Sequence, residues 1–170
     1  VDIVAKNGCM LLNVPPNPDG SIPPVMVNLL TEIGAWLNIN GEAIYGTRPW
    51  TIFGEGPTRL PEGGHKIEKI KIEYTNADIR YTKKSDKEFF AIVMDKPDRE
   101  IVMKSLSTEI GALNSSIQTV ELLGSQEDIV WERNERGLVI QQPSELSSDY
   151  AHSFRILLGG HEEVDIDGND

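Results

Sequence analysis

The chain has 170 residues, of which 39% are hydrophobic and 25% charged, a composition ordinary for a globular protein. Its 16 Lys and Arg residues against 27 Asp and Glu residues give a formal net charge of −11. This balance argues against binding to nucleic acid, whose phosphates need clustered Lys and Arg, and against docking on an anionic membrane surface. No apolar run is long enough to span a bilayer, and no signal peptide is evident.

A compact apolar run near the start of the chain is the first predicted element. Cys9 to Val14 is nearly continuous in apolar residues, which is typical of a strand covered on both faces. Cys9 is the single cysteine, so no intrachain disulfide can form, and we expect a buried thiol. The loop that follows carries five prolines, and Asp19-Gly20 marks a turn in it.

A helix of about four turns is predicted after this loop. Pro23 and Pro24 stand where a helix start tolerates proline, and Asn40-Gly41 supplies a left-handed stop. One face carries an apolar stripe of Leu29, Leu30, Ile33, Trp36 and Leu37. A buried strand followed by such a helix is half of an α/β unit, so residues 1–50 form one βα unit.

The remainder of the chain predicts a linker, an all-β domain and a tail. Residues 51–64 are rich in Gly and Pro and are interpreted as a linker. From 65 to 158 the hydrophobic period is two, and turn residues separate short strands, which predicts an antiparallel two-sheet β-sandwich. The strand candidates are Ile79–Thr82, Phe89–Met94, Glu100–Leu106, Ile117–Leu123, Ile129–Glu132, Leu138–Gln141 and Ser153–Leu158, with a further alternation at Ile70, Ile72 and Tyr74. Residues 159–170 are acidic and interpreted as a flexible tail.

This organisation is lopsided, because one βα unit cannot bury its own strand. It needs neighbouring strands from outside this sequence, or an improvised packing on the sandwich. We therefore expect the chain to be the C-terminal part of a larger α/β protein.

Polar residues give no convincing catalytic or metal constellation. With 27 carboxylates, chance pairs occur at any spacing. Glu42 is expected to form a structural hydrogen bond or ion pair, for example to Arg48, and Glu127-Asp128 to be a solvated turn. His65, His152 and His161 lack zinc spacing, and the final Asp165–Asp170 lacks the spacing of a calcium loop, so no metal site is predicted.

The three tryptophans are assigned to packing, since none can be placed on an exposed sugar-binding platform. Trp36 lies on the apolar stripe of the helix and Trp131 lies within a strand candidate. Trp50 is expected to wedge the two domains together at their junction.

Long motifs carry a resemblance to a known family. "KNGCMLLNVPPNPDGSIPP" (Lys6 to Pro24) and "LTEIGAWLNINGEAIYGTRPW" (Leu30 to Trp50) resemble the end of the catalytic domain of α-L-fucosidases of glycoside hydrolase family 29. The later segments "DIRYTKKSDKEFFAIVMDKP", "VELLGSQEDIVWERNERGLVIQQP" and "FRILL" resemble the C-terminal β-sandwich of that family. The resemblance covers residues 1 to about 158, in the right order.

The resemblance implies a (β/α)₈-like barrel followed by a sandwich. It implies retaining hydrolysis of α-L-fucosides of glycans without a cofactor, outside the cytoplasm in periplasm, medium or lysosome. An Asp nucleophile and a Glu acid/base would stand about 5 Å apart. In the family both precede the last barrel strand, so no catalytic residue is assigned to this chain, and the chain alone is predicted to be inactive.

Two residues are candidates for substrate binding at the pocket edge. The carboxyl ends of barrel strands face the active site. Asn13, where the last strand would end, either shapes the fucose pocket or caps the strand. Met10 either contacts the apolar side of the sugar or fills the core.

A second interpretation is a non-catalytic β-sandwich that binds glycans or packs against a partner. The first fifty residues argue against it, because a binding module has no use for a barrel-type strand and closing helix. In either case, the helix stripe lacks its barrel neighbours. We expect it to pack against the sandwich or to mediate self-association.

Overall fold

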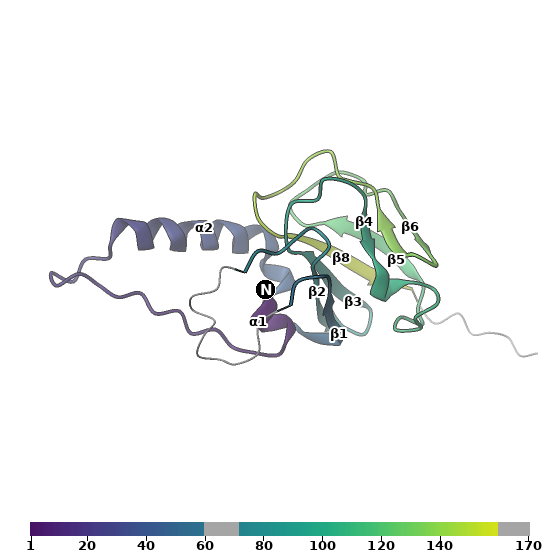
Figure 1. Ribbon diagram of the computed structural model, residues 1–170, viewed down its shortest axis with the longest axis horizontal. Helices are drawn as coiled ribbons and strands as arrows, with labels where there is room; N and C mark the ends of the chain where they lie inside the picture. Colours follow the sequence, from purple (N-terminus) through teal and green to yellow (C-terminus); the bar gives the residue numbers. More distant parts are fainter. Residues whose placement is uncertain (60–71, 160–170) are drawn as a thin grey trace, which may run out of the picture.

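The computed structural model describes residues 1–59 and 72–159 (Figure 1). The described part holds two α-helices, two 3₁₀ turns and eight strands. In chain order these are α1 (Asp2–Ala5), α2 (Pro24–Asn40), η1 (Gly41–Ala43), β1 (Arg48–Glu55), β2 (Ile79–Ser85), β3 (Glu88–Val93), β4 (Ile101–Met103), η3 (Lys104–Leu106), β5 (Ile117–Leu122), β6 (Trp131–Asn134), β7 (Gly137–Ile140) and β8 (His152–Leu158).

The strands form two antiparallel sheets, which confirms the predicted sandwich. The larger sheet has the order β1-β2-β3-β8-β5 and the smaller one the order β4-β7-β6. Alternating side chains of both sheets meet in one core, in which Phe89, Met103 and Phe154 have at most 1% of their surface exposed. This alternation is what a period of two produces in a strand.

A second, smaller core lies on the other face of the five-stranded sheet, which we call the outer face. Phe90 and Ile92 point there from β3, between the inward-facing Phe89, Ala91 and Val93. Ala43 of η1 and the half-buried Trp36 of α2 pack against them. The central strand β3 is therefore covered on both faces, which explains its nearly continuous apolar sequence.

The predicted helix is confirmed at both ends, with Pro23 as N-cap, Pro24 as first residue and Asn40 as last residue, but the left-handed conformation expected at its stop is wrong. Gly41 is right-handed (φ −60°) and the chain continues into η1, while the left-handed glycine is Gly46 (φ 70°). The N-terminal half of α2 points away from the strands in Figure 1. Its apolar residues are exposed there, including Val25 at 69% and Leu29 at 47%.

The strand predicted at Cys9–Val14 does not form in this structure. These residues are irregular, and Cys9, expected as a buried thiol, is exposed. A strand is stable only beside another strand, and none of the strands in residues 1–59 and 72–159 pairs with this segment. The helix half of the βα unit is present without its strand half.

The linker predicted at 51–64 is wrong over residues 51–55, because β1 runs through them. Gly54 is one of the glycines that favoured a linker, yet it lies within β1, and a Cβ there would lie 2.5 Å from the carbonyl oxygen of Ile79. Glycine lets β1 approach β2 closely at a register shift between Pro49 and Gly54. Residues 60–64 lie outside the described residues, as do Ile70 and most of the tail.

Trp50 lies in β1, and the role predicted for it is wrong. Its side chain does not wedge two domains, but stacks on Phe89 within the sandwich core, with ring centroids 5.1 Å apart. Smaller shifts affect two other strands: the candidate Ile129–Glu132 begins at Trp131, and the candidate Glu100–Leu106 divides into β4 and η3. Trp131 packs against the core as expected.

Candidate functional site

An apolar groove lies where α1 and α2 meet the outer face of the five-stranded sheet. It has a volume of about 630 Å³. Its apolar lining comes from both helices and the segment after α1, and includes Val4, Met10, Leu29, Ile33, Trp36 and Leu37. Met10 and Leu29 are exposed and the other four are half-buried, so the groove presents an uncovered apolar surface.

Two long-range hydrogen bonds hold α2 to the segment before β8 at this groove. The Trp36 indole N–H donates to the carbonyl oxygen of Ala151 at 2.8 Å. The Tyr150 hydroxyl donates to Glu32 at 2.7 Å, and this carboxylate raises the pKa of Tyr150. Both bonds fix the C-terminal half of α2.

An ionic clasp holds α1 to β2. The Asp2 carboxylate accepts hydrogen bonds from the Arg80 Nε at 2.5 Å and from Lys6 at 2.9 Å. Burial acts to raise the pKa of Asp2, but the bonds from Lys6 and Arg80 outweigh it, so the pKa is lowered. Arg80 is buried, and it also donates to the carbonyl oxygens of Glu55 and Ile79.

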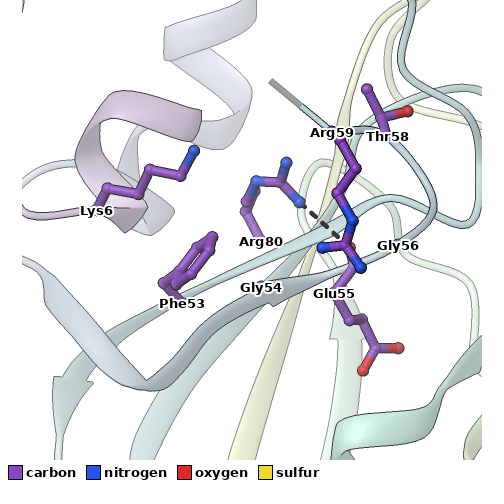
Figure 2. Close-up of a pocket in the computed structure, with 8 residues that line it drawn as sticks. All are labelled: Lys6, Phe53, Gly54, Glu55, Gly56, Thr58, Arg59 and Arg80. Atoms are coloured by element: carbon purple, nitrogen blue, oxygen red, sulfur yellow. Dashed lines mark hydrogen bonds between the residues drawn. The ribbon is translucent and has the colours of Figure 1, made fainter. Parts of the chain in front are cut away.

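A basic pocket adjoins this clasp, with a volume of about 460 Å³ (Figure 2). Lys6, Arg59 and Arg80 line it beside the half-exposed Phe53. In Figure 2 the Glu55 carboxylate points away from Arg80; it accepts the backbone N–H groups of η3. Chemically the pocket can attract an anionic group, although Asp2 already offsets one of its charges.

Further polar contacts fix η1 and the end of α2 to the outer face. Thr82 of β2 donates to the Ala43 carbonyl oxygen at 2.7 Å, and the backbone N–H of Ser153 donates to Asn40 at 3.2 Å. Glu42 is ion-paired, as expected, but its partner is Arg155 rather than Arg48. Arg155 also pairs with Glu88 and Glu121 at 3.3 Å each.

The pocket-edge candidates occupy an exposed segment. Met10 is 61% exposed and lines the apolar groove, and Asn13 is exposed in irregular backbone. The structure does not bring the two together around a cavity, and their roles stay predictions. The turn predicted at Asp19-Gly20 is present: Gly20 has φ 84°, and Asp19 accepts both the N–H and the hydroxyl of Ser21.

The other polar candidates have structural roles within the described residues. Glu127, expected to be solvated, accepts bonds from the N–H and hydroxyl of Ser144 and so ties two loops together. His152 is fully buried, while His65 and His161 lie outside the described residues. Residues 1–59 and 72–159 hold no group of three or more His, Cys, Asp or Glu side chains suited to a metal ion.

Neither the Asp2–Arg80 clasp nor α1 was predicted from the sequence. The available signal was weak: Arg80 is a charged residue between two buried strand positions, Ile79 and Tyr81. Such a residue must point to the opposite face of the sheet, where it needs a carboxylate.

The fold thus defines a class: a β-sandwich whose larger sheet carries a helical segment on its outer face. Residues 1–42 match the family model described as alpha-L-fucosidase, and residues 72–157 match the alpha-L-fucosidase C-terminal domain. The chain belongs to the alpha-L-fucosidase family, which confirms the resemblance. Across the same described residues, no helix has the length and apolar character needed to cross a membrane.

Curated relatives agree with this assignment. The tissue alpha-L-fucosidases of Bos taurus and Homo sapiens are 29% and 28% identical to the chain over 162 and 161 residues, covering 92% of it. The alpha-L-fucosidase of Branchiostoma floridae is 32% identical over 149 residues. The chain spans only about 29% of the length of the first two relatives and 28% of the third.

Solved structures extend the agreement to three dimensions. The Thermotoga maritima alpha-fucosidase superposes with a TM-score of 0.67 at 28% identity, and so does its complex with fucose. Each match covers 92% of this chain and 32% of the other. The chain therefore corresponds to about a third of such a structure.

Proposed function

We propose that the chain is the C-terminal portion of a retaining α-L-fucosidase that hydrolyses terminal α-L-fucosides of glycans. In this proposal residues 1–50 complete the catalytic barrel, the sandwich braces the barrel, and the preceding part of the protein carries the two catalytic carboxylates. Family membership and the one-third coverage of solved fucosidases support it.

One observation carries the bracing role. The two segments matched by the two family models pack against each other through the outer face of one sheet. The clasp from Asp2 to Arg80 and the bond from the Ser153 N–H to Asn40 link them across 78 and 113 residues of sequence. A movement of the sandwich would therefore move α1 and the end of α2.

The described carboxylates support a non-catalytic role for this portion. A retaining mechanism needs two carboxyl groups about 5 Å apart, one of them free to attack the anomeric carbon. Glu42, Glu88 and Glu121 all converge on the single guanidinium of Arg155, in a structural ion-pair network. Asp78 accepts four hydrogen bonds from Thr58 and Thr75, a structural arrangement.

The exposed segment around Asn13 and Met10 supports the remaining part of the proposal. In the whole protein this segment forms the last barrel strand, with Asn13 at the pocket edge and Met10 beside the sugar. The substrates of the whole protein are fucosylated glycans. Relatives named tissue and plasma alpha-L-fucosidase support a location outside the cytoplasm.

The test is release of nitrophenol from an aryl α-L-fucoside, by the 170-residue chain and by the same chain extended with its upstream sequence. We expect activity only in the extended protein. Activity of the short chain would contradict the placement of the carboxylates. Fucoside binding without hydrolysis in both proteins would favour the competing interpretation, a non-catalytic glycan-binding sandwich.

A further inference from the structure

The loop between η3 and β5 contains a motif that hydrolysis does not use. Asn114-Ser115-Ser116 is an Asn-X-Ser sequence in which X is not proline. The full chain has ten asparagines, and only Asn114 is followed in this way by Ser or Thr. Such a motif is the acceptor sequence for N-linked glycans in secreted proteins. A three-residue motif also arises by chance, so the argument for a modification site depends on where the structure places the asparagine.

The structure places this motif at the surface on a firmly held backbone. Arg133 donates to the carbonyl oxygens of the residues on either side of Asn114: Leu113 at 2.7 Å and Ser115 at 3.1 Å. Leu113 is buried, whereas Asn114 and Ser116 are exposed. The backbone is therefore anchored while the acceptor side chain and the third-position serine both face solvent.

The loop also lies far from the part of the molecule that the barrel would cover. β5 is the edge strand opposite β1, and Asn114 precedes its first residue. The α2 end meets the turn after β5, where a Cβ on Gly124 would lie 2.6 Å from the Ile39 side chain. The six residues of β5 separate these two places by roughly 20 Å. A glycan at Asn114 would leave the outer face and the apolar groove free.

We propose that Asn114 is an N-glycosylation site. A lipid-diphosphate-linked oligosaccharide is the donor: its C1–O bond to the diphosphate breaks and a bond forms between C1 and the Asn114 Nδ2. The diphosphate leaves with the bonding electrons, and the amide nitrogen loses one proton. The glycan also stands beside the free edge of β5, where bulk hinders pairing with another strand. This inference rests on the proposed location outside the cytoplasm, not on the hydrolysis.

The test is production of the full chain behind a cleavable secretory leader in eukaryotic cells. The leader-cleaved protein, from cell extract and from medium, is measured by mass before and after digestion with peptide-N-glycosidase. We expect a mass loss, with an aspartate at position 114. Asn114→Gln and Ser116→Ala should abolish it.

Two matched variants separate recognition of the motif from a general effect on the loop. Ser115→Ala changes the middle position, which the transferase does not read, and should keep the glycan, as should Ser116→Thr. Leader-cleaved protein without a glycan, or a glycan that persists in Asn114→Gln, would overturn the proposal. Neither result depends on fucosidase activity, so failure of the proposed hydrolysis is a separate outcome.

Discussion

At the residue scale, His152 is a titratable group in a fully buried position. It is the first residue of β8, opposite Val93, with none of its surface exposed. Neither ring nitrogen has a hydrogen-bond partner within the described residues. Burial lowers its pKa, assisted by Lys96 and opposed by Asp95 and Asp149. The neutral ring is therefore the folded form.

This depressed pKa predicts a loss of stability in mild acid. The unfolded chain takes up a proton near pH 6.5, before the folded chain does, so the free energy of unfolding falls as the pH drops from 6.5 to the folded pKa. The loss is about 1.4 kcal/mol for each unit separating the two pKa values. In His152→Leu this component should vanish. Urea titrations from pH 7.5 to 5 measure it, and parallel curves for both proteins would contradict the assignment.

Thr82 makes a buried bond between the sheet and η1. Its hydroxyl donates to the Ala43 carbonyl oxygen, and both residues have no exposed surface. Thr82→Val keeps the shape but leaves that oxygen only the long 3.5 Å bond from the Thr47 hydroxyl, and should lower the free energy of unfolding by about 1–3 kcal/mol. Thr119→Val, at an exposed position of β5, is the control and should change it by less than about 0.5 kcal/mol. Equal effects in denaturant unfolding would contradict a role for the bond.

At the element scale, the end of α2 docks against a glycine turn after β5. Gly124 has φ 79°, and a Cβ there would lie 2.6 Å from Ile39 and 3.1 Å from Ser147. Gly111 has a similar φ of 67° but nothing within 4 Å of its Cβ position. The two glycines therefore share the backbone requirement and differ only in the contact with α2.

Alanine at either position should cost about 1–2 kcal/mol for the left-handed backbone. Gly124→Ala should cost roughly 1–3 kcal/mol more, because the new methyl group forces the helix and turn apart. Adding Ile39→Ala to Gly124→Ala should recover part of this additional loss in the free energy of unfolding, because the truncated side chain leaves room for the new methyl group. Thermal or urea unfolding of the three variants checks this, and equal losses at the two glycines would show that the contact is loose.

The strands of the sandwich could be predicted from sequence because local pattern and burial agree there. The nearly continuous apolar run Phe89–Met94 is predicted as a strand, and β3 occupies Glu88–Val93. The run Cys9–Val14 has the same pattern but is irregular, because a strand also needs a neighbour, which a local pattern does not report. The opposite error occurs at Gly54. Its stretch is predicted to be a linker, but the glycine lies in a strand and allows two strands to approach closely.

The candidate site could be predicted less well, for a related reason. The clasp joins Asp2 to Arg80 across 78 residues, so its existence depends on the tertiary structure and not on spacing. Glu42 was expected to form an ion pair, but the choice of Arg155 over Arg48 depends on the register of β8 against β3. Asn13 and Met10 rest on the family resemblance alone.

At the scale of the whole molecule, the uncovered apolar groove predicts self-association of the isolated 170-residue chain. Val25, Leu29 and Met10 each expose between 47% and 69% of their surface around α2 and the groove. Burying such side chains yields about 1.5–3 kcal/mol each. We propose that copies of this chain associate through the groove, and expect the apparent mass in sedimentation to rise with concentration.

Leu29→Lys should weaken that association at least about tenfold, since each 1.4 kcal/mol is a factor of ten. Val130→Lys is the matched control: Val130 is 57% exposed but does not line the groove. It should leave the association unchanged. A wild-type chain that stays monomeric at all concentrations, or equal effects of both lysines, would contradict the role of the groove.

Chemical labelling of the catalytic nucleophile tests most directly whether the catalytic carboxylates lie outside this chain. A fluorinated fucosyl fluoride traps the covalent fucosyl-enzyme of a retaining fucosidase, because the intermediate forms faster than it is hydrolysed. The extended protein is labelled, digested and mapped by mass spectrometry. We expect one labelled carboxylate, upstream of Val1, with residues 1–170 unlabelled. A label on an Asp or Glu within these 170 residues would contradict the proposed function, because the chain would then carry the catalytic chemistry instead of bracing the barrel.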